Sequence, residues 1–253
     1  MSGRGLNRRQ FGKIIGAAGV GGALDPTAAS ASAQESAPQK RVAFTFFTRD
    51  EAAFVEAALD HLIPADELGP GAREAGVVVF IDRQLSGAFG TAAKWYMQGP
   101  WGESIPEQGY QLPLTPQQLY RLCIDEINEY CQSQYGERFD QVRSEQQRTV
   151  LEAIDDGSLP LQGVPIAEFF NTLLQNTFEG FFSDPLYGGN RDKVGWRLVG
   201  FPGVGAAYRT RSRQYNEPYL VEPVSIEDVI VGRARLDEGG HVEHEPLSPE
   251  HKG

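Results

Sequence analysis

Apolar residues recur at helical spacing through much of the chain, and signals for helix starts and ends flank them. Thr48 and Glu51 form the threonine-x-x-glutamate pattern of a capping box, and Pro64 stops the helix that follows. Thr115 followed by Pro116 marks another start, because proline is favoured at the first helical position. Together these patterns predict helices at about 48–63, 72–85, 115–135, 144–156 and 166–182.

The apolar run at 77–81 fits two kinds of element. It could form a buried strand, and a short apolar run does not by itself distinguish a strand from a helix. The polar residues beside the run and the short loop after it favour the helix.

The predicted helices give a mainly α fold, with a single irregular helical domain at 44–215. Its loops at 99–114 and 183–203 are long and rich in glycine, proline and aromatic residues, a composition usual in functional or interfacial loops. Residues 216–253 are rich in proline and glutamate. They predict an extended or flexible tail with one β-leaning patch at 228–231.

The beginning of the chain, residues 1–33, has the pattern of a twin-arginine export signal. A weakly apolar, uncharged run at 14–24 follows a paired arginine, an aromatic residue and a lysine. The residues of the export motif are Arg8, Arg9, Phe11 and Lys13. The twin-arginine route exports proteins that are already folded. The pattern therefore predicts a protein that folds before export and resides in the periplasm.

The end of this signal predicts cleavage. Ala31 and Ala33 offer the small residues that a signal peptidase prefers, and a linker at 34–43 follows. The alternative is an uncleaved short anchor, but the run at 14–24 is well short of the roughly 20 residues that a membrane helix needs.

The charge of the chain excludes some classes of partner. The full chain carries a formal charge of −11, and residues 1–33 hold four basic residues and one acidic residue, so cleavage would leave −14. Such a surface repels nucleic-acid phosphates and anionic lipid headgroups. We therefore expect no nucleic-acid partner and no direct electrostatic docking on membranes.

Two cysteines, Cys123 and Cys131, lie eight residues apart on one predicted helix. At 1.5 Å per residue their Cα atoms are roughly 12 Å apart along the axis, beyond the reach of a mutual disulfide. Two interpretations stay open. Both thiols are buried on a helix face, or one of them forms a disulfide with a partner chain.

The sequence offers no convincing active site. It lacks the Cys-x-x-Cys-His motif of covalent haem, and two cysteines cannot hold a four-cysteine iron–sulfur cluster. His241 and His244 lie in the tail without a scaffold for a metal, and His61 is expected to interact with a helix end. We expect no cofactor in this chain. The alternatives are a stand-alone periplasmic oxidoreductase with a site around His61 and Asp184, or a small-ligand-binding protein.

Large aromatic side chains gather at 95–110 and 178–201, and we expect the loops 95–111 and 181–203 to form much of the contact with a partner. Some are expected to fill the helical core, but tryptophan and tyrosine beside glycine and proline also suit a rigid protein–protein interface. The predicted contact residues are Trp95, Trp101, Tyr110, Asp184, Tyr187, Asn190, Trp196 and Phe201.

Short motifs along the chain resemble the gluconate 2-dehydrogenase subunit 3 family, the small subunit of bacterial membrane-associated sugar and polyol dehydrogenases. They cover about residues 44–208 in the order of the family. The motifs are Phe46-Phe47-Thr48, Ile63-Pro64-Ala65-Asp66, Gly69-Pro70-Gly71-Ala72, Phe80-Ile81-Asp82, Gly99-Pro100-Trp101, Gly109-Tyr110-Gln111, Phe181-Phe182-Ser183-Asp184-Pro185, Tyr187-Gly188-Gly189-Asn190, Gly195-Trp196 and Gly200-Phe201-Pro202-Gly203.

This resemblance implies a non-catalytic accessory subunit. In the family, a large partner of the glucose-methanol-choline type binds FAD and oxidises the sugar or polyol, and a cytochrome c with haem c often carries the electrons to quinone. The small subunit supports maturation of the large one, and its twin-arginine signal carries the large one out. Membrane association through these partners is then expected.

Overall fold

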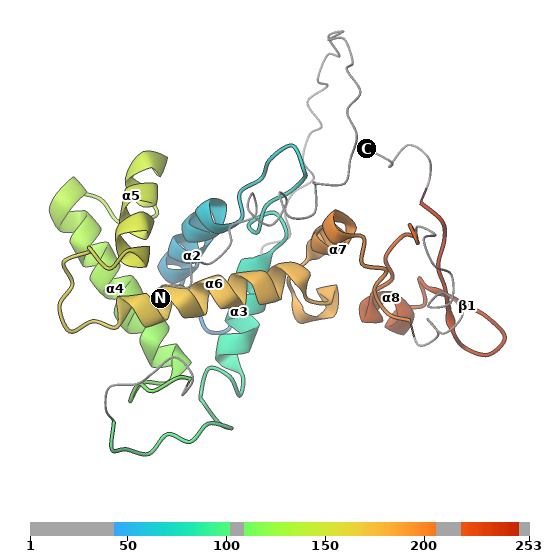
Figure 1. The fold of residues 1–253 in the computed structure, drawn as a ribbon, viewed down its shortest axis with the longest axis horizontal. Coiled ribbons are helices and arrows are strands. Elements are labelled where there is room, and N and C mark those ends of the chain that lie inside the picture. Colours follow the sequence, from blue (N-terminus) through green and yellow to red (C-terminus); the bar gives the residue numbers. More distant parts are fainter. Residues whose placement is uncertain (1–42, 102–108, 206–218, 248–253) are drawn as a thin grey trace, which may run out of the picture. The chain divides into compact units, whose positions relative to one another are not determined.

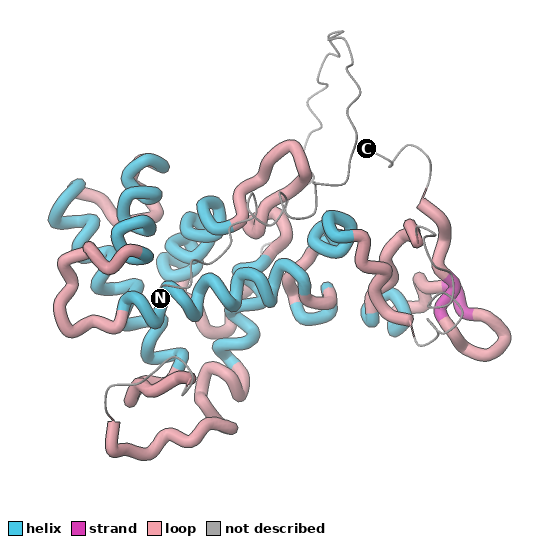
Figure 2. The backbone as a smooth tube through the Cα atoms, viewed as in Figure 1, coloured by secondary structure: helices cyan, strands magenta, loops and turns pink. Residues whose placement is uncertain are grey.

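The computed structural model describes residues 43–101, 109–205 and 219–247. The chain divides into two units at the boundary between Ala43 and Phe44, and the helices below all belong to the second unit. The described part is mainly α-helical, as the sequence predicts, with one short pair of strands near its end (Figure 1, Figure 2). None of the helices in these ranges is long and apolar enough to cross a membrane.

Five helices make up the helical body. They are α2 (Arg49–Leu62), α3 (Val77–Ser86), α4 (Pro116–Tyr135), α5 (Ser144–Asp155) and α6 (Ile166–Phe182). The predicted limits of α2, α4 and α6 agree with these bounds to within a residue or two, because the start signals are local. Thr48 and Glu51 exchange hydrogen bonds at the start of α2, and Thr115 and Gln118 do the same at α4.

Helix α3 differs from its prediction. The run 77–81 is helical rather than a strand, but the helix begins at Val77 instead of near residue 72. Contacts with distant parts of the chain hold the preceding turn. The Ala72 amide donates to the carbonyl of Ile63, and the carbonyl of Ala75 accepts from the amide of Arg191.

Helix α6 is the central element of the body and contacts α2, α3, α4, α5 and α7 (Figure 1). Its apolar face buries Phe169 and Leu173 in the core. Gly180 lets α3 approach closely, because a Cβ at this position would lie 2.9 Å from atoms of both Phe80 and Val77. The hydrophobic core of the described residues is therefore built around this helix.

The buried Asp82 of α3 fixes the segment that leads into α2. Its two carboxylate oxygens accept the backbone amides of Thr45, Phe46 and Phe47 at 2.8–2.9 Å. These bonds hold the chain so that Phe47 is buried and Thr48 can cap the helix. A carboxylate from a later helix thus organises the start of the domain.

The described residues beyond α6 form short elements joined by loops. They are η3 (Pro185–Tyr187), η4 (Arg191–Lys193), α7 (Val194–Val199), α8 (Ile226–Ile230) and the antiparallel pair β1 (Arg235–Leu236) and β2 (Val242–Glu243). The β-leaning patch at 228–231 is not a strand, since it lies in α8 and the turn after it. The local reason is a capping box, in which Ser225 and Asp228 exchange hydrogen bonds and start a helix.

Residues 219–247, which we name the C-terminal strap, join the body through backbone hydrogen bonds. The Val204 amide donates to the Val224 carbonyl at 2.8 Å, and the Val224 amide donates to the Pro202 carbonyl at 3.0 Å. Gly203 sits at this contact with a φ of +82°, and an added Cβ would lie 2.0 Å from the Val224 oxygen. Only glycine fits such a close approach in that conformation.

Candidate functional site

The eight predicted contact residues fall into two groups in the structure. Trp95, Trp101, Tyr187 and Phe201 are exposed and Tyr110 is half-buried. Asp184, Asn190 and Trp196 are buried inside the chain. Each of these three side chains has a structural role inside the chain, and a direct contact with a partner stays a prediction for them.

Trp95, Trp101 and Tyr110 lie in the segment between α3 and α4. The Trp95 ring packs between Phe89 and Tyr110, with centroid separations of 5.7 and 5.0 Å. The Tyr110 hydroxyl donates to the Leu114 carbonyl at 2.7 Å, which fixes the ring. Trp95, Tyr110 and Trp101 line a shallow hollow of about 610 Å³. An exposed tryptophan held by neighbouring rings is the kind of side chain that anchors protein interfaces.

Asn190 organises the chain between α6 and α7. Its amide group donates to the Ser183 carbonyl, and its side-chain oxygen accepts the Gly195 amide, both at 2.8 Å. The residue has a φ of +48°, a left-handed conformation that asparagine tolerates better than most residues. The side chain therefore serves as an internal tie.

Trp196 fills the same junction from α7. Its side chain is 5% exposed, and its indole nitrogen donates to the Phe182 carbonyl at 2.7 Å at the end of α6. Gly195 permits this packing, because a Cβ there would lie 2.1 Å from the Phe181 oxygen. The ring of the exposed Phe201 stands edge-on to Trp196 at 5.2 Å, so a buried ring supports an exposed one.

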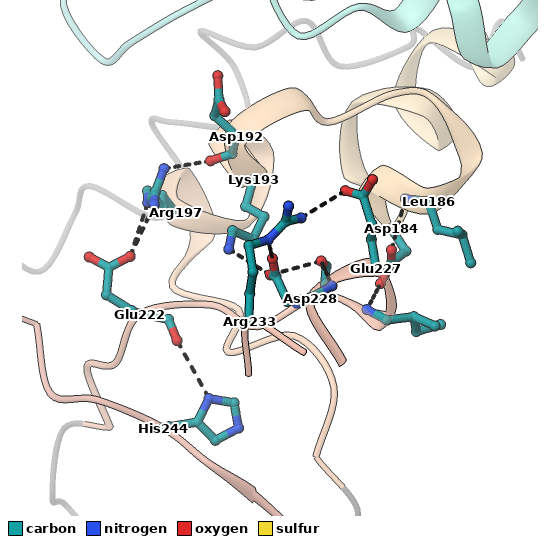
Figure 3. Close-up of polar contacts among 12 residues, drawn as sticks. Asp184, Leu186, Asp192, Lys193, Arg197, Glu222, Glu227, Asp228, Arg233 and His244 are labelled. Atoms are coloured by element: carbon teal, nitrogen blue, oxygen red, sulfur yellow. Dashed lines mark hydrogen bonds and ion pairs between the residues drawn. The ribbon is translucent and has the colours of Figure 1, made fainter. Parts of the chain in front are cut away.

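Asp184 joins the body to the strap. One carboxylate oxygen accepts the Leu186 amide at 3.0 Å, and the other accepts the Ile226 amide at 2.7 Å (Figure 3). The same side chain thus receives an amide from η3 and an amide from α8. The sequence does not reveal the hydrogen bond between Asp184 and Ile226, because these two residues are 42 positions apart.

Charged residues make the second connection between body and strap. Asp228 accepts hydrogen bonds from Lys193 at 2.8 Å, from Arg233 at 2.9 Å and from both donors of Ser225, as Figure 3 shows for the charged pairs. Arg197 pairs with Glu222 at 3.1 Å nearby. These residues line a polar hollow of about 930 Å³ between η4 and the strap.

The protonation of Asp228 follows from this arrangement. Burial raises the pKa of the carboxyl, but the hydrogen bonds from Lys193, Ser225 and Arg233 outweigh burial and hold the pKa well below its usual value. The charged form is therefore favoured in the folded chain.

We expect the strap to loosen in acid. Because the folded pKa of Asp228 is lowered, its stabilisation is complete above the ordinary aspartate pKa of about 4 and declines as the pH falls below it. Hydrogen exchange between pH 7 and pH 2.5 should show residues 219–247 losing protection before α6. In Asp228→Asn the same segment should be less protected at neutral pH and less sensitive to acid. An identical pH profile for this variant and the parent chain would refute the role of Asp228.

Both cysteines are buried on α4 and neither forms a disulfide. Both lie on the one helix Pro116–Tyr135, which is the arrangement that the argument against a mutual disulfide assumes. Burial raises the pKa of the Cys123 thiol to about 12 and that of Cys131 to about 11, so both stay protonated at neutral pH. Their burial fits the interpretation as core side chains, and a disulfide to a partner stays a prediction.

The residues of the proposed stand-alone active site have separate structural partners. His61 Nε2 lies 3.0 Å from the Gln147 side-chain oxygen, whereas Asp184 binds the amides of η3 and α8. His241 pairs with Asp237 in the turn between the two strands. Within 43–101, 109–205 and 219–247, no cluster of three potential ligands could hold a metal ion.

Other predicted residues cannot be placed. The export motif Arg8, Arg9, Phe11 and Lys13 and the cleavage residues Ala31 and Ala33 lie outside the described residues. Their roles stay predictions.

Comparison with known proteins gives one finding. A family model described as gluconate 2-dehydrogenase subunit 3 matches residues 49–203, a span that runs from α2 to the residues just after α7. No curated protein and no solved structure matches the chain significantly. The strap lies beyond the matched span.

Proposed function

The chain belongs to the gluconate 2-dehydrogenase subunit 3 family, and from this membership we propose that it is a non-catalytic accessory subunit of a periplasmic dehydrogenase complex. A separate large chain of the glucose-methanol-choline type binds FAD and oxidises a sugar or polyol. A cytochrome c with haem c accepts the electrons where a third subunit is present. The complex associates with the membrane through these partners.

The observation that carries this proposal is the extent of the family match. The matched span contains the whole helical body, including α6 and the Asn190–Trp196 junction, so the likeness concerns the folded core of the protein. A family described as a subunit implies partner chains. The exposed aromatics of the body, Trp95, Trp101, Tyr187 and Phe201, supply side chains of the type that anchor such contacts.

The proposed role is to hold and escort the flavin chain. A rigid helical body with fixed aromatic rings can stabilise a partner by binding its folded form, since any molecule that binds only the folded state shifts the equilibrium toward it. The export motif at residues 8–13 then carries the folded pair across the membrane together. The large chain needs no signal of its own in this arrangement.

Replacement of the paired arginines tests this role in the native organism. In Arg8→Lys/Arg9→Lys both this chain and the flavin chain should stay in the cytoplasm, and dehydrogenase activity outside it should fall by at least about tenfold. Arg4→Lys is the matched control, because it makes the same change outside the motif. Normal export of the flavin chain beside the double variant would contradict the escort role.

A further inference from the structure

Helix α8 is oriented against the usual rule for a surface helix. Asp228 faces inward and is buried among its polar partners, whereas Ile226, Val229 and Ile230 are exposed. These three apolar residues have the spacing i, i+3 and i+4 and so share one face of the helix. A helix anchored by its polar side, with its apolar side turned outward, has an apolar face that the described chain leaves uncovered.

The apolar face of α8 continues onto η3. The two elements are in contact, and Asp184 accepts the Ile226 amide with one oxygen and the Leu186 amide with the other. Leu186 and Tyr187 of η3 are themselves exposed. We name this combined area the α8–η3 surface, and its residues are Leu186, Tyr187, Ile226, Val229 and Ile230.

The surface is held firmly although its apolar side chains are exposed. Asp184 and the ion pair between Lys193 and Asp228 tie α8 to the body. The Arg83 guanidinium donates to the Leu186 carbonyl at 3.0 Å and fixes η3 from α3. An apolar surface whose backbone is already ordered loses little conformational entropy when a partner binds.

The net charge of the chain favours one of two possible partners for the α8–η3 surface. A second copy of the chain would bring together two molecules of charge −11, which repel each other across a self-complementary interface. A different protein with an apolar groove and a neutral or basic rim meets no such penalty. The surface also includes Tyr187, one of the exposed aromatics of the proposed partner contact.

We propose that the α8–η3 surface is a docking site for the flavin-binding subunit of the complex, which covers it with an apolar groove. This inference rests on the proposed function and adds the place of contact. Helix α8 lies beyond the matched span of 49–203 and η3 lies within it, so the surface joins the family body to a segment that the family match does not cover.

The test measures binding of full-length variants to the flavin chain that co-purifies with the tagged parent protein. Ile230 is 67% exposed, so Ile230→Asp should leave the fold intact while placing a charge on the surface. It should weaken binding by at least about tenfold, because a buried, unpaired charge is strongly unfavourable at an interface. Tyr187→Ala should also weaken binding. Leu236→Asp is the matched control in the same strap and should bind like the parent.

The outcomes separate this inference from the proposed function. If the parent captures the flavin chain and Ile230→Asp and Tyr187→Ala bind it equally well, the docking site is wrong and the accessory role stands. If the parent instead forms dimers that Ile230→Asp abolishes, a second copy covers the surface and the proposal is overturned. If the parent captures no flavin chain at all, the proposed function itself fails.

Discussion

Trp196→Ala should destabilise the protein strongly, although the sequence places Trp196 among the predicted contact residues. The side chain is 5% exposed and its indole nitrogen donates to the Phe182 carbonyl. Truncation of a buried tryptophan costs about 3 to 5 kcal/mol, and the carbonyl loses its partner as well. Thermal unfolding followed by circular dichroism should show a midpoint lower by about 10 °C.

Trp101→Ala is the matched control, since it removes the same side chain from a position that is 36% exposed. The unfolding midpoint should stay within about 2 °C of the parent, because exposed substitutions rarely exceed 0.5 kcal/mol. Equal losses of stability in the two variants would show that the division into buried and exposed aromatics is wrong.

Asp82→Ala should have the second large effect. Three backbone amides, those of Thr45, Phe46 and Phe47, lose their acceptor in a single change. Hydrogen bonds to a charged group contribute about 1.5 to 3 kcal/mol each. Water can replace the carboxylate only at amides that solvent reaches, so the free energy of unfolding should fall by at least about 3 kcal/mol. Urea unfolding measures the change in free energy directly.

Asp82→Asn keeps the volume of the side chain nearly unchanged, so it tests the contribution of the hydrogen bonds alone. Its amide oxygen can still accept the Phe46 and Phe47 amides, whereas the Thr45 amide would face a donor. The asparagine variant should therefore retain part of the stability that alanine loses. If the alanine variant unfolds at the urea concentration of the parent, the carboxylate does not organise this segment.

The residues that shape the helices were predictable because their partners are close in sequence. Thr48 and Glu51 meet across three residues, and so do Thr115 and Gln118. The same local chemistry explains why 228–231 is not a strand. The capping pair of Ser225 and Asp228 starts a helix and outweighs the strand preference of the valines and isoleucine.

The division of the contact residues could not be predicted, because it depends on partners that the fold brings together. Trp196 and Phe201 look alike in the sequence, but only Trp196 reaches the end of α6. The Lys193–Asp228 pair spans 35 residues, and no pattern along the chain marks it. Ser225 and Asp228 gave the one available signal for α8, a capping box within the predicted tail.

Several motifs that carry the family resemblance prove to be structural. Asp82 ties down the start of the domain, Asn190 links the ends of α6 and α7, and Gly195 allows Trp196 to pack. The resemblance is therefore a likeness of the folded body. The exposed residues among the predicted contacts, such as Trp95 and Phe201, are side chains that this body holds in place.

The most direct test of the accessory-subunit role is a pull-down from native membranes and periplasm with a tag at Gly253. The purified material is read by visible absorbance, by gel electrophoresis and by dehydrogenase activity with an artificial electron acceptor. We predict a yellow complex, in which a larger co-purifying chain carries the flavin and the activity is lost when the two chains are separated. A colourless chain that purifies alone, or one that oxidises a sugar without a second chain, would contradict the account.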